Sequence, residues 1–479
     1  MRAAPQRLTI LHTNDIHSHF EMMSPLAAII TEQRANTEDP VLLVDIGDHM
    51  DRAAVETEGT MGQANINVMN LTGYDAVTVG NNEGLTFTSE MLEVLIKGLN
   101  CPVVCCNFLD SSTGRPPHWM KSHTILVKDG IRIGITGATV AFSSFYSLLG
   151  WEVTEPEEAL REQCLLLAPQ VDVLIVLSHL GLPADKQLAE SLQGVHAILG
   201  GHTHHLLEQP LIINGTAVCG AGKFGRYVGK LTFERSGEDP RFKLVTGECI
   251  PVDPNHTEDQ IGPVISLDLA RSQEALSQTV AVTNRELPLN LHGESPFGNL
   301  LAQAVRQFTG SQISLVNTGQ LLGPLPKGEI STGLLHALCP SPINSCIMML
   351  SGRNIRTALE QSLTEGFQSK VIYGYGFRGE RLGSLAVDGL KILCKAQSMP
   401  YDNGIEIYVE GELLEDERDY SVGTLDMFTF QMGYESIAKG KDIVFMLPHF
   451  LRDLLRIELS RSGSLDACEV LRWDSKLFN

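Results

Sequence analysis

The stretch Leu8-Thr9-Ile10-Leu11-His12-Thr13-Asn14-Asp15-Ile16-His17 leads an apolar strand into a loop that carries a carboxylate and an imidazole. A second stretch, Gly200-Gly201-His202-Thr203-His204, follows the apolar run 195–199 in the same way. Asp-x-His and His-x-His at strand ends each bring two metal-binding side chains to one side of a loop. The two stretches therefore predict a metal site at the carboxyl edge of a sheet.

Three weaker motifs lie between these two, and each also follows an apolar run: Gly47-Asp48, Gly80-Asn81 and Ser178-His179. Each one alone also fits an ordinary turn or helix cap. All five together, each at a strand end, indicate one polynuclear site. Mixed carboxylate, amide and imidazole ligands favour Mn, Zn, Co or Fe over Mg. Asp48, central in the set, is the expected bridge between two ions about 3.5–4 Å apart, whose shared water becomes hydroxide near neutral pH.

The first half of the chain alternates strand-like and helix-like segments, which predicts an α/β fold with function at the strand ends. The expected strands are 8–12, 41–45, 76–79, 171–177 and 197–199, with a hairpin formed by 125–127 and 131–136. The expected helices are 26–35, 61–71, 86–99, 156–167 and 183–192.

A chain of 479 residues is long enough for two domains, each with its own core. The polar, proline-containing stretch 236–256 is the expected boundary, and 257–276 can form a linking helix. We expect a catalytic domain over 1–255, a linker helix within 256–280 and a second, smaller domain over 281–479.

The net charge of -21 argues against nucleic acid or an anionic membrane as the main partner. No apolar run has the length of a signal peptide or a membrane span, and the ten scattered cysteines are expected to be free thiols. The expected location is the cytoplasm, with a small-molecule partner and no obligate protein partner. An anionic substrate would need local positive charge, which bound metal ions could supply.

The five motifs, read as Thr13-Asn14-Asp15-Ile16-His17, Gly47-Asp48-x-x-Asp51, Gly80-Asn81-x-Glu83, Ser178-His179-Leu180-Gly181 and the 200–204 stretch, resemble the calcineurin-like metallophosphoesterases. More narrowly, the chain resembles the 5′-nucleotidase family over nearly its whole length. The segments 294–301, 317–319 and 326–330 are similar to that family's C-terminal domain.

This resemblance implies a four-layer α/β/β/α metallophosphoesterase domain, joined by a helix to a smaller α+β domain that selects the substrate. It also implies two divalent metal ions. One ion would be held by Asp15, His17, Asp48 and His204. The other would be held by Asp48, Asn81, His179 and His202. Closure of one domain over the other is a further expectation of the resemblance.

The chain departs from the family where Gly-Asn-His-Glu is expected, because Asn82 replaces the histidine and Leu85 replaces the aspartate that orients it. Asn82 can donate a hydrogen bond but cannot carry a proton at neutral pH. General-acid help contributes about 10²–10⁴-fold in rate, so a slower enzyme or one that favours good leaving groups is expected. His49 is the first candidate to substitute, and His19 and His205 are further candidates.

The second domain also lacks the family's arginine, because Thr318-Gly319-Gln320 replaces a Gly-Gly-Gly-x-Arg segment, and the acidic residue of its Gly-Gly-Asp-Gly segment is missing too. The family holds the base between two phenylalanines, a suitable surface for a flat ring. The candidates to bind substrate are Phe377, Arg378, Phe428 and Phe430, with Arg353, Arg356 and Arg381 as further cations.

The resulting prediction is a dinuclear-metal phosphoesterase that hydrolyses a nucleoside monophosphate or a related phosphate ester and serves nucleotide catabolism. Three alternatives remain. In the first, the substrate is a nucleotide sugar or another diphosphate. In the second, it is a cyclic nucleotide, which requires phosphodiesterase activity. In the third, the chain is a metal-bearing binding protein whose catalysis was lost with the histidine and aspartate pair.

Overall fold

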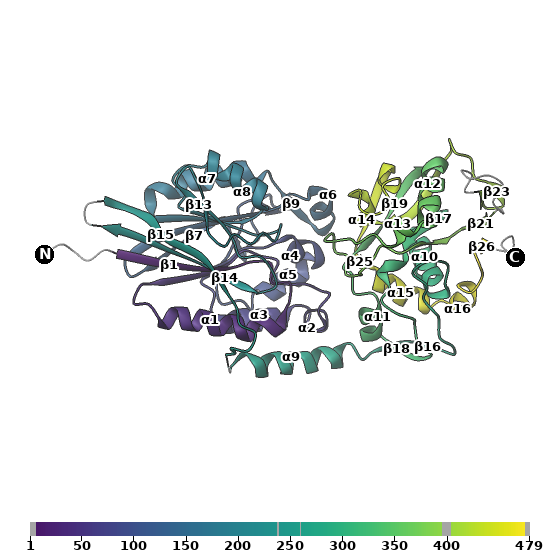
Figure 1. Ribbon diagram of the computed structural model, residues 1–479, viewed down its shortest axis with the longest axis horizontal. Coiled ribbons are helices and arrows are strands. Elements are labelled where there is room, and N and C mark those ends of the chain that lie inside the picture. The colour runs from purple at the N-terminus through teal and green to yellow at the C-terminus, as the bar shows by residue number, and fades with distance from the viewer. Residues whose placement is uncertain (1–5, 237–238, 259, 395–403, 475–479) are drawn as a thin grey trace. The chain divides into compact units, whose positions relative to one another are not determined.

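The computed structural model describes residues 6–236, 239–258, 260–394 and 404–474, which form two compact units (Figure 1). The first unit is Met1–Gln273 and the second is Glu274–Asn479. The division falls inside α9 (Ile261–Ala275), the helix that occupies the region where a linking helix is expected.

The first unit contains a seven-stranded sheet, in which five strands run parallel: β1, β2, β3, β4 and β6. Its order is β15 (Asp239–Pro251), β14 (Tyr227–Ser236), β1 (Gln6–Thr13), β2 (Val41–Asp45), β3 (Ala76–Val77), β4 (Val103–Val104) and β6 (Met120–Lys121).

A six-stranded sheet forms the second β-layer of this unit, and its central strands are also parallel. Its order is β12 (Leu211–Ile213), β13 (Thr216–Gly220), β11 (Ala197–Gly200), β10 (Val173–His179), β8 (Ile131–Thr139) and β7 (His123–Lys128). The expected hairpin is confirmed, because β7 and β8 pair antiparallel from Lys128 and Ile131 onward.

The two sheets pack face to face through fully buried aliphatic side chains. Leu8 and Ile10 on β1 meet Ile133, Ile135 and Ile175 from the other sheet in this core. The helices α7 (Pro156–Leu167) and α8 (Leu182–Ser191) cover the outer face of the six-stranded sheet, and α1 (Met23–Ala35), α3 (Gln63–Thr72) and α5 (Ser89–Ile96) lie beside the other sheet (Figure 1). The expected four-layer α/β/β/α architecture is confirmed.

Two expectations about local structure need correction. The strand expected over 76–79 is only the two-residue β3, because its pairing with β2 ends at Val77, although the backbone N–H of Thr78 still donates to the Asp45 carbonyl at 3.0 Å. The polar stretch 236–256 is not a boundary, because it contains the whole of β15, which pairs with β14. As an edge strand with a largely exposed surface, β15 lacks the apolar signature of a buried strand.

The second unit is a mixed α+β domain built on a five-stranded sheet. The sheet's order is β20 (Leu385–Asp388), β17 (Ile313–Asn317), β24 (Asp419–Leu425), β19 (Asn344–Ser351) and β25 (Lys441–Phe450). The helix α10 (Pro296–Thr309) packs against β17 and α15 (Leu451–Leu459); it begins with a proline in its first turn and ends at Gly310, whose φ is +67°. Smaller sheets pair β16 (Thr279–Thr283) with β18 (Gly328–Ser331), and β21 (Leu390–Cys394) with β22 (Ile405–Val409), β23 (Glu412–Leu413) and β26 (Trp473–Asp474).

Within the described ranges, no helix combines the length and the apolar character needed to cross a membrane. All ten cysteines are free thiols, as expected.

Candidate metal centre

The loop after β1 carries Asp15 and His17 in a backbone conformation that L-residues rarely adopt, with φ of +51° and +49°. Two hydrogen bonds hold this loop against the loop after β2. The backbone N–H of Asp15 donates to the Gly47 carbonyl at 3.0 Å, and that of His17 donates to the Asp48 carbonyl at 2.9 Å. The ends of two neighbouring parallel strands therefore fix the first ligand pair.

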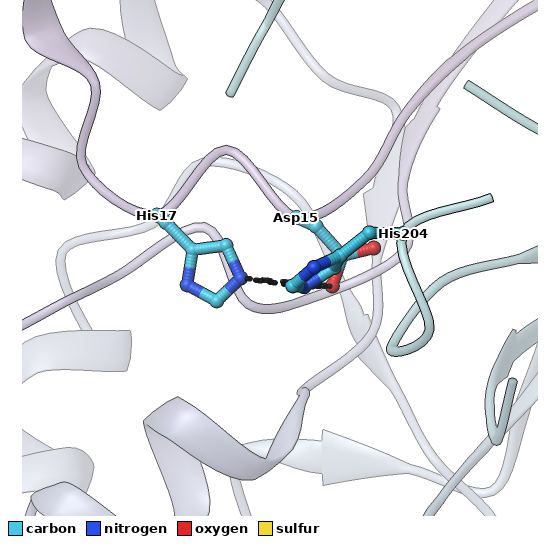
Figure 2. Close-up of side chains that lie close together, drawn as sticks. All are labelled: Asp15, His17 and His204. Carbon is cyan, nitrogen blue, oxygen red and sulfur yellow. Dashed lines mark hydrogen bonds and ion pairs between the residues drawn. The ribbon is translucent and has the colours of Figure 1, made fainter. Parts of the chain in front are cut away.

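His204, from the loop after β11, completes the first cluster with Asp15 and His17. Figure 2 shows the ring of His17 turned toward Asp15 and His204. The Nε2 atoms of the two imidazoles lie 3.1 Å apart, and His204 Nε2 lies 3.4 Å from Asp15 Oδ1. Three side chains from strands of both sheets thus converge on one point.

A second cluster joins Asp15 to Asp48 and His179, all three buried. Asp48 Oδ2 lies 3.4 Å from His179 Nε2 and 3.8 Å from His17 Nε2, so this carboxylate reaches both clusters. The other ring nitrogen of His179 lies 2.8 Å from the Ile46 carbonyl, which orients the imidazole.

Asn81 and His202 lie next to each other at this site. Asn81 Oδ1 is 2.8 Å from His202 Nδ1. The backbone N–H of His202 lies 3.0 Å from both carboxylate oxygens of Asp15, which ties the loop after β11 to the loop after β1. The structure therefore brings all seven sequence-predicted metal ligands into one contiguous cluster.

The charges at the centre shift the titration of its members. Burial alone would lower the pKa of His179, but the carboxylate of Asp48 raises it to about 10. Burial alone would raise the pKa of Asp48, but the imidazole of His179 holds it well below its usual range. Burial lowers the pKa of His202 to about 4, which keeps that ring neutral.

The residues present fit a metal ion. His179 Nε2 is buried, faces a carboxylate and has no hydrogen-bond partner among the described residues. Asp48, His202 and His204 share the left-handed backbone of the first loop, with φ of +50°, +70° and +57°. Strain of about 1–3 kcal/mol at such a position persists where function requires it. Imidazole nitrogens and carboxylate oxygens gathered in this way are the ligands of the borderline divalent metals.

Glu83 is a residue of this site to which the sequence reasoning assigned no role. Its buried carboxylate accepts hydrogen bonds from three backbone N–H groups, those of Asp48 at 3.0 Å, Gly80 at 2.8 Å and Met50 at 2.9 Å. It therefore holds the loop after β2 against the start of α4 (Asn81–Thr86). Its place as the third residue of that helix, where an acidic residue forms a capping box, is the signal that could have indicated this role.

Asn82 contacts the metal centre directly. Its Nδ2 lies 3.0 Å from His17 Nδ1 and donates to the Met50 carbonyl at 3.0 Å, while its backbone N–H donates to Asp48 Oδ1 at 2.7 Å.

His49, by contrast, lies in the interior, where its ring contacts Asn65 and Tyr74 and burial lowers its pKa to about 3. A ring so buried is poorly placed to transfer a proton to a substrate. The other two candidate histidines lie nearer the surface, where His205 contacts Thr203 and His19 contacts Glu21.

The substrate-binding candidates of the second unit fall into two groups. Phe377 and Phe428 are buried and belong to the core, which limits their access to a ligand. Phe430 is partly exposed, and its ring pairs with that of Tyr375 at a centroid distance of 5.4 Å. Tyr375 was missed because the stretch Tyr373-Gly374-Tyr375-Gly376 matches none of the motifs considered.

The arginines proposed for anion binding mostly support local structure. Arg353 pairs with Glu417, Arg356 Nε donates to Asp416 at 3.0 Å, and Arg381 donates to the Ser369 carbonyl at 2.9 Å. Arg378 donates through its guanidinium to the Phe377 carbonyl at 3.2 Å, and its backbone N–H donates to Ser341 Oγ.

Two family models match the chain: the calcineurin-like phosphoesterase over residues 8–206 and the 5′-nucleotidase C-terminal domain over residues 274–436. The chain therefore belongs to the calcineurin-like metallophosphoesterases, and within them to the 5′-nucleotidase family. Members of this family are phosphoester hydrolases that use divalent metal ions. The chain is accordingly a metal-dependent phosphoester hydrolase.

Individual proteins agree with this membership. The chain is 33% identical to the metallophosphoesterase YunD of Bacillus subtilis (strain 168), itself uncharacterized, over 95% of this chain and all of that protein. It is 26% identical to the 5′-nucleotidase of Bos taurus over 75% of this chain and 72% of that protein. The crystal structure of the 5′-nucleotidase precursor from Thermus thermophilus shares the fold, with a TM-score of 0.61, 24% identity and coverage of 98% and 97% of the two chains.

Proposed function

We propose that this enzyme hydrolyses nucleoside phosphates with two divalent metal ions, and that it serves nucleotide catabolism. The observation that carries the proposal is the buried Nε2 of His179, which makes no hydrogen bond among the described residues but faces Asp48 Oδ2 at 3.4 Å, beside the paired Nε2 atoms of His17 and His204. Such an arrangement leaves nitrogen and oxygen lone pairs directed at common points. The seven proposed ligands are Asp15, His17, Asp48, Asn81, His179, His202 and His204.

Asp15, His17 and His204 would hold one ion, and His179, Asn81 and His202 the other. Asp48 would be shared, because its Oδ2 atom lies near both His17 and His179. When bound, a pair of divalent ions offsets the charge of a phosphoryl group and makes bound water hydroxide near neutral pH. Imidazole in both clusters favours Mn²⁺, Zn²⁺, Co²⁺ or Fe over Mg²⁺.

Asn82 determines which leaving groups the enzyme can expel. Its amide can donate a hydrogen bond but supplies no proton at neutral pH, and the groups it contacts, His17 and Asp48, are themselves proposed metal ligands. A leaving oxygen must therefore depart with its own negative charge, which favours esters whose leaving group has a low pKa.

The nucleoside part of the substrate would be bound by the second unit. The ring pair formed by Tyr375 and Phe430 supports this role, because both rings are partly exposed and offer faces to a base. Membership in a family named for 5′-nucleotidases also supports a nucleotide substrate. The cytoplasmic location and the absence of an obligate protein partner stay predictions.

The test is hydrolysis after metal removal and reconstitution. Purified protein is treated with a chelator, supplied with Mn²⁺, Zn²⁺, Co²⁺ or Mg²⁺, and assayed with p-nitrophenyl phosphate, its bis ester and a nucleotide panel. We expect turnover of the monoester and of nucleotides that depends on added metal. Preference for the bis ester would replace the proposal by the cyclic-nucleotide alternative, and no turnover with any metal would favour a binding protein.

A further inference from the structure

The segment that follows β13 returns to the metal centre in a strained conformation. Gly222, Phe224 and Gly225 have φ of +73°, +66° and +66°. Glycine adopts this region readily, but a phenylalanine there costs about 1–2 kcal/mol. The surrounding structure must therefore hold Phe224 in place.

Three hydrogen bonds do so, and all of them come from the loop that carries the first metal ligand. Asn14 Oδ1 accepts from the backbone N–H of Ala221 at 2.9 Å, and Asn14 Nδ2 donates to the Gly222 carbonyl at 2.7 Å. The backbone N–H of Phe224 donates to the Asp15 carbonyl at 2.8 Å. Strain that is maintained beside a functional centre points to a function of the strained residue.

The ring of Phe224 lies close to His17 of the metal centre and to two cations. Its centroid is 6.0 Å from that of His17 and 4.0 Å from that of His19. Lys223 Nζ lies 4.4 Å from the same centroid, and the guanidinium carbon of Arg226 lies 5.7 Å from it. One aromatic ring therefore lies close both to a proposed metal ligand and to a lysine ammonium.

These two cations lie at one aromatic ring in a chain of net charge -21. Within the part of the chain that the structure describes, neither Lys223 nor Arg226 forms an ion pair. The carboxylate of Glu21, a near neighbour in the sequence, contacts His19 Nδ1 at 2.6 Å. A cation above an aromatic face keeps its N–H donors available to an anion.

We propose that Lys223 and Arg226 bind a second phosphate group of the substrate, so that the enzyme prefers a diphosphate such as a nucleoside diphosphate to a monophosphate. This inference rests on the proposed function and deepens it. The terminal phosphate would occupy the metal centre, and the inner phosphate would lie on the cations beside Phe224.

The chemistry of Asn82 agrees with this substrate class. Hydrolysis breaks the bond between the terminal phosphorus and the bridging oxygen, and the water oxygen joins the terminal phosphorus as orthophosphate. The electron pair of the broken bond stays on the bridging oxygen, which becomes part of the nucleoside monophosphate. One water proton remains on orthophosphate and the other goes to solvent. Such a leaving group departs as an anion and requires no general acid, which Asn82 could not supply.

The test is calorimetric binding, which requires no turnover. Mn²⁺-loaded protein at fixed free metal is titrated with methylenediphosphonate, which carries two phosphonate groups, and with methylphosphonate, which carries one. We expect wild-type protein to bind the diphosphonate more tightly. Lys223→Met should reduce that preference about tenfold, the worth of one charge-assisted contact, and Lys223→Arg should largely restore it.

Lys230→Met is the matched control, since Lys230 lies on β14 and its Nζ donates to Gln33 at 2.8 Å. This variant should keep the wild-type preference. An equal loss of affinity for the diphosphonate and the monophosphonate in Lys223→Met would overturn the inference. An unchanged preference for the diphosphonate in the Lys223→Met/Arg226→Met double variant would overturn it as well. Intact diphosphonate preference without hydrolysis of any ester would instead contradict only the proposed function.

Discussion

Asn82 and His17 are in contact at the metal centre, with Asn82 Nδ2 3.0 Å from His17 Nδ1. The same asparagine is anchored to Met50 and to Asp48, so its position is fixed by three different groups. The residue at position 82 is therefore built into the centre even though it cannot transfer a proton. Its identity should control which leaving groups the enzyme accepts.

The double variant Asn82→His/Leu85→Asp should widen the range of leaving groups. A histidine at position 82, oriented by a carboxylate at position 85, could protonate a poor leaving oxygen. We expect turnover of AMP to rise about tenfold relative to p-nitrophenyl phosphate, a small part of the contribution that a general acid can make. Steady-state kinetics on both substrates checks this, with Leu85→Asp alone as the control. Equal changes in turnover of AMP and of p-nitrophenyl phosphate would show that position 82 does not act on the leaving group.

Asp48→Asn should lower kcat by about 10³-fold, because it removes the carboxylate that reaches both clusters. Asparagine tolerates the φ of +50° at this position, so the loop should keep its shape. The control is Asp129→Asn, an exposed residue of the β7–β8 turn with φ of +49°. Turnover of p-nitrophenyl phosphate with saturating Mn²⁺ is the measurement, and wild-type activity in Asp48→Asn would remove Asp48 from the centre.

Tyr375→Ala should weaken nucleotide use while sparing the small ester. Loss of one aromatic face costs about 1–3 kcal/mol of base stacking, so KM for a nucleotide should rise by about tenfold. Tyr373→Ala is the control, because Tyr373 is exposed and, of the residues with a described position, none forms a ring pair with it. An equal effect of Tyr375→Ala on p-nitrophenyl phosphate would argue against a base-binding role.

Asp426 should make the second unit less stable as the pH rises. Burial raises the pKa of its carboxyl to about 7, although it accepts a hydrogen bond from the Asn344 backbone N–H at 3.1 Å. The folded state therefore favours the neutral acid. Its contribution to stability is full below the unfolded pKa, near 4, and is lost as the pH rises through 7.

Asp426→Asn should consequently raise the free energy of unfolding by about 2–4 kcal/mol at pH 8, with a gain that shrinks toward pH 4. Urea unfolding at several pH values measures this, with the exposed Asp442→Asn as the control. A gain independent of pH would mean that Asp426 is ionised in the folded protein.

The fold and the convergence of the candidate metal ligands could be predicted because each rests on a local pattern. Asp15 and His204 follow apolar runs, and the carboxyl ends of parallel strands meet at one edge of a sheet. The edge strand β15 was not predicted, because its largely exposed stretch has the polar composition expected of a domain boundary. The length of β3 could not be predicted either, since its pairing with β2 ends at Val77 although the apolar run continues to Val79.

Residues whose role depends on burial or on distant contacts could not be assigned from the sequence. His49 follows Asp48 directly, yet its ring turns into the core against Asn65. Phe428 and Phe430 are two positions apart, but only Phe430 is accessible. Lys223 lies over the ring of Phe224, whose backbone N–H donates to the Asp15 carbonyl, a contact between segments more than 200 residues apart in the sequence.

The central claim is that the seven side chains bind two metal ions. Anomalous-scattering crystallography of the Mn²⁺-loaded protein tests it most directly. We predict two manganese peaks about 3.5–4 Å apart, with Asp48 in contact with both and His17 and His179 on different ions. A single peak, or manganese bound away from these side chains, would contradict the account.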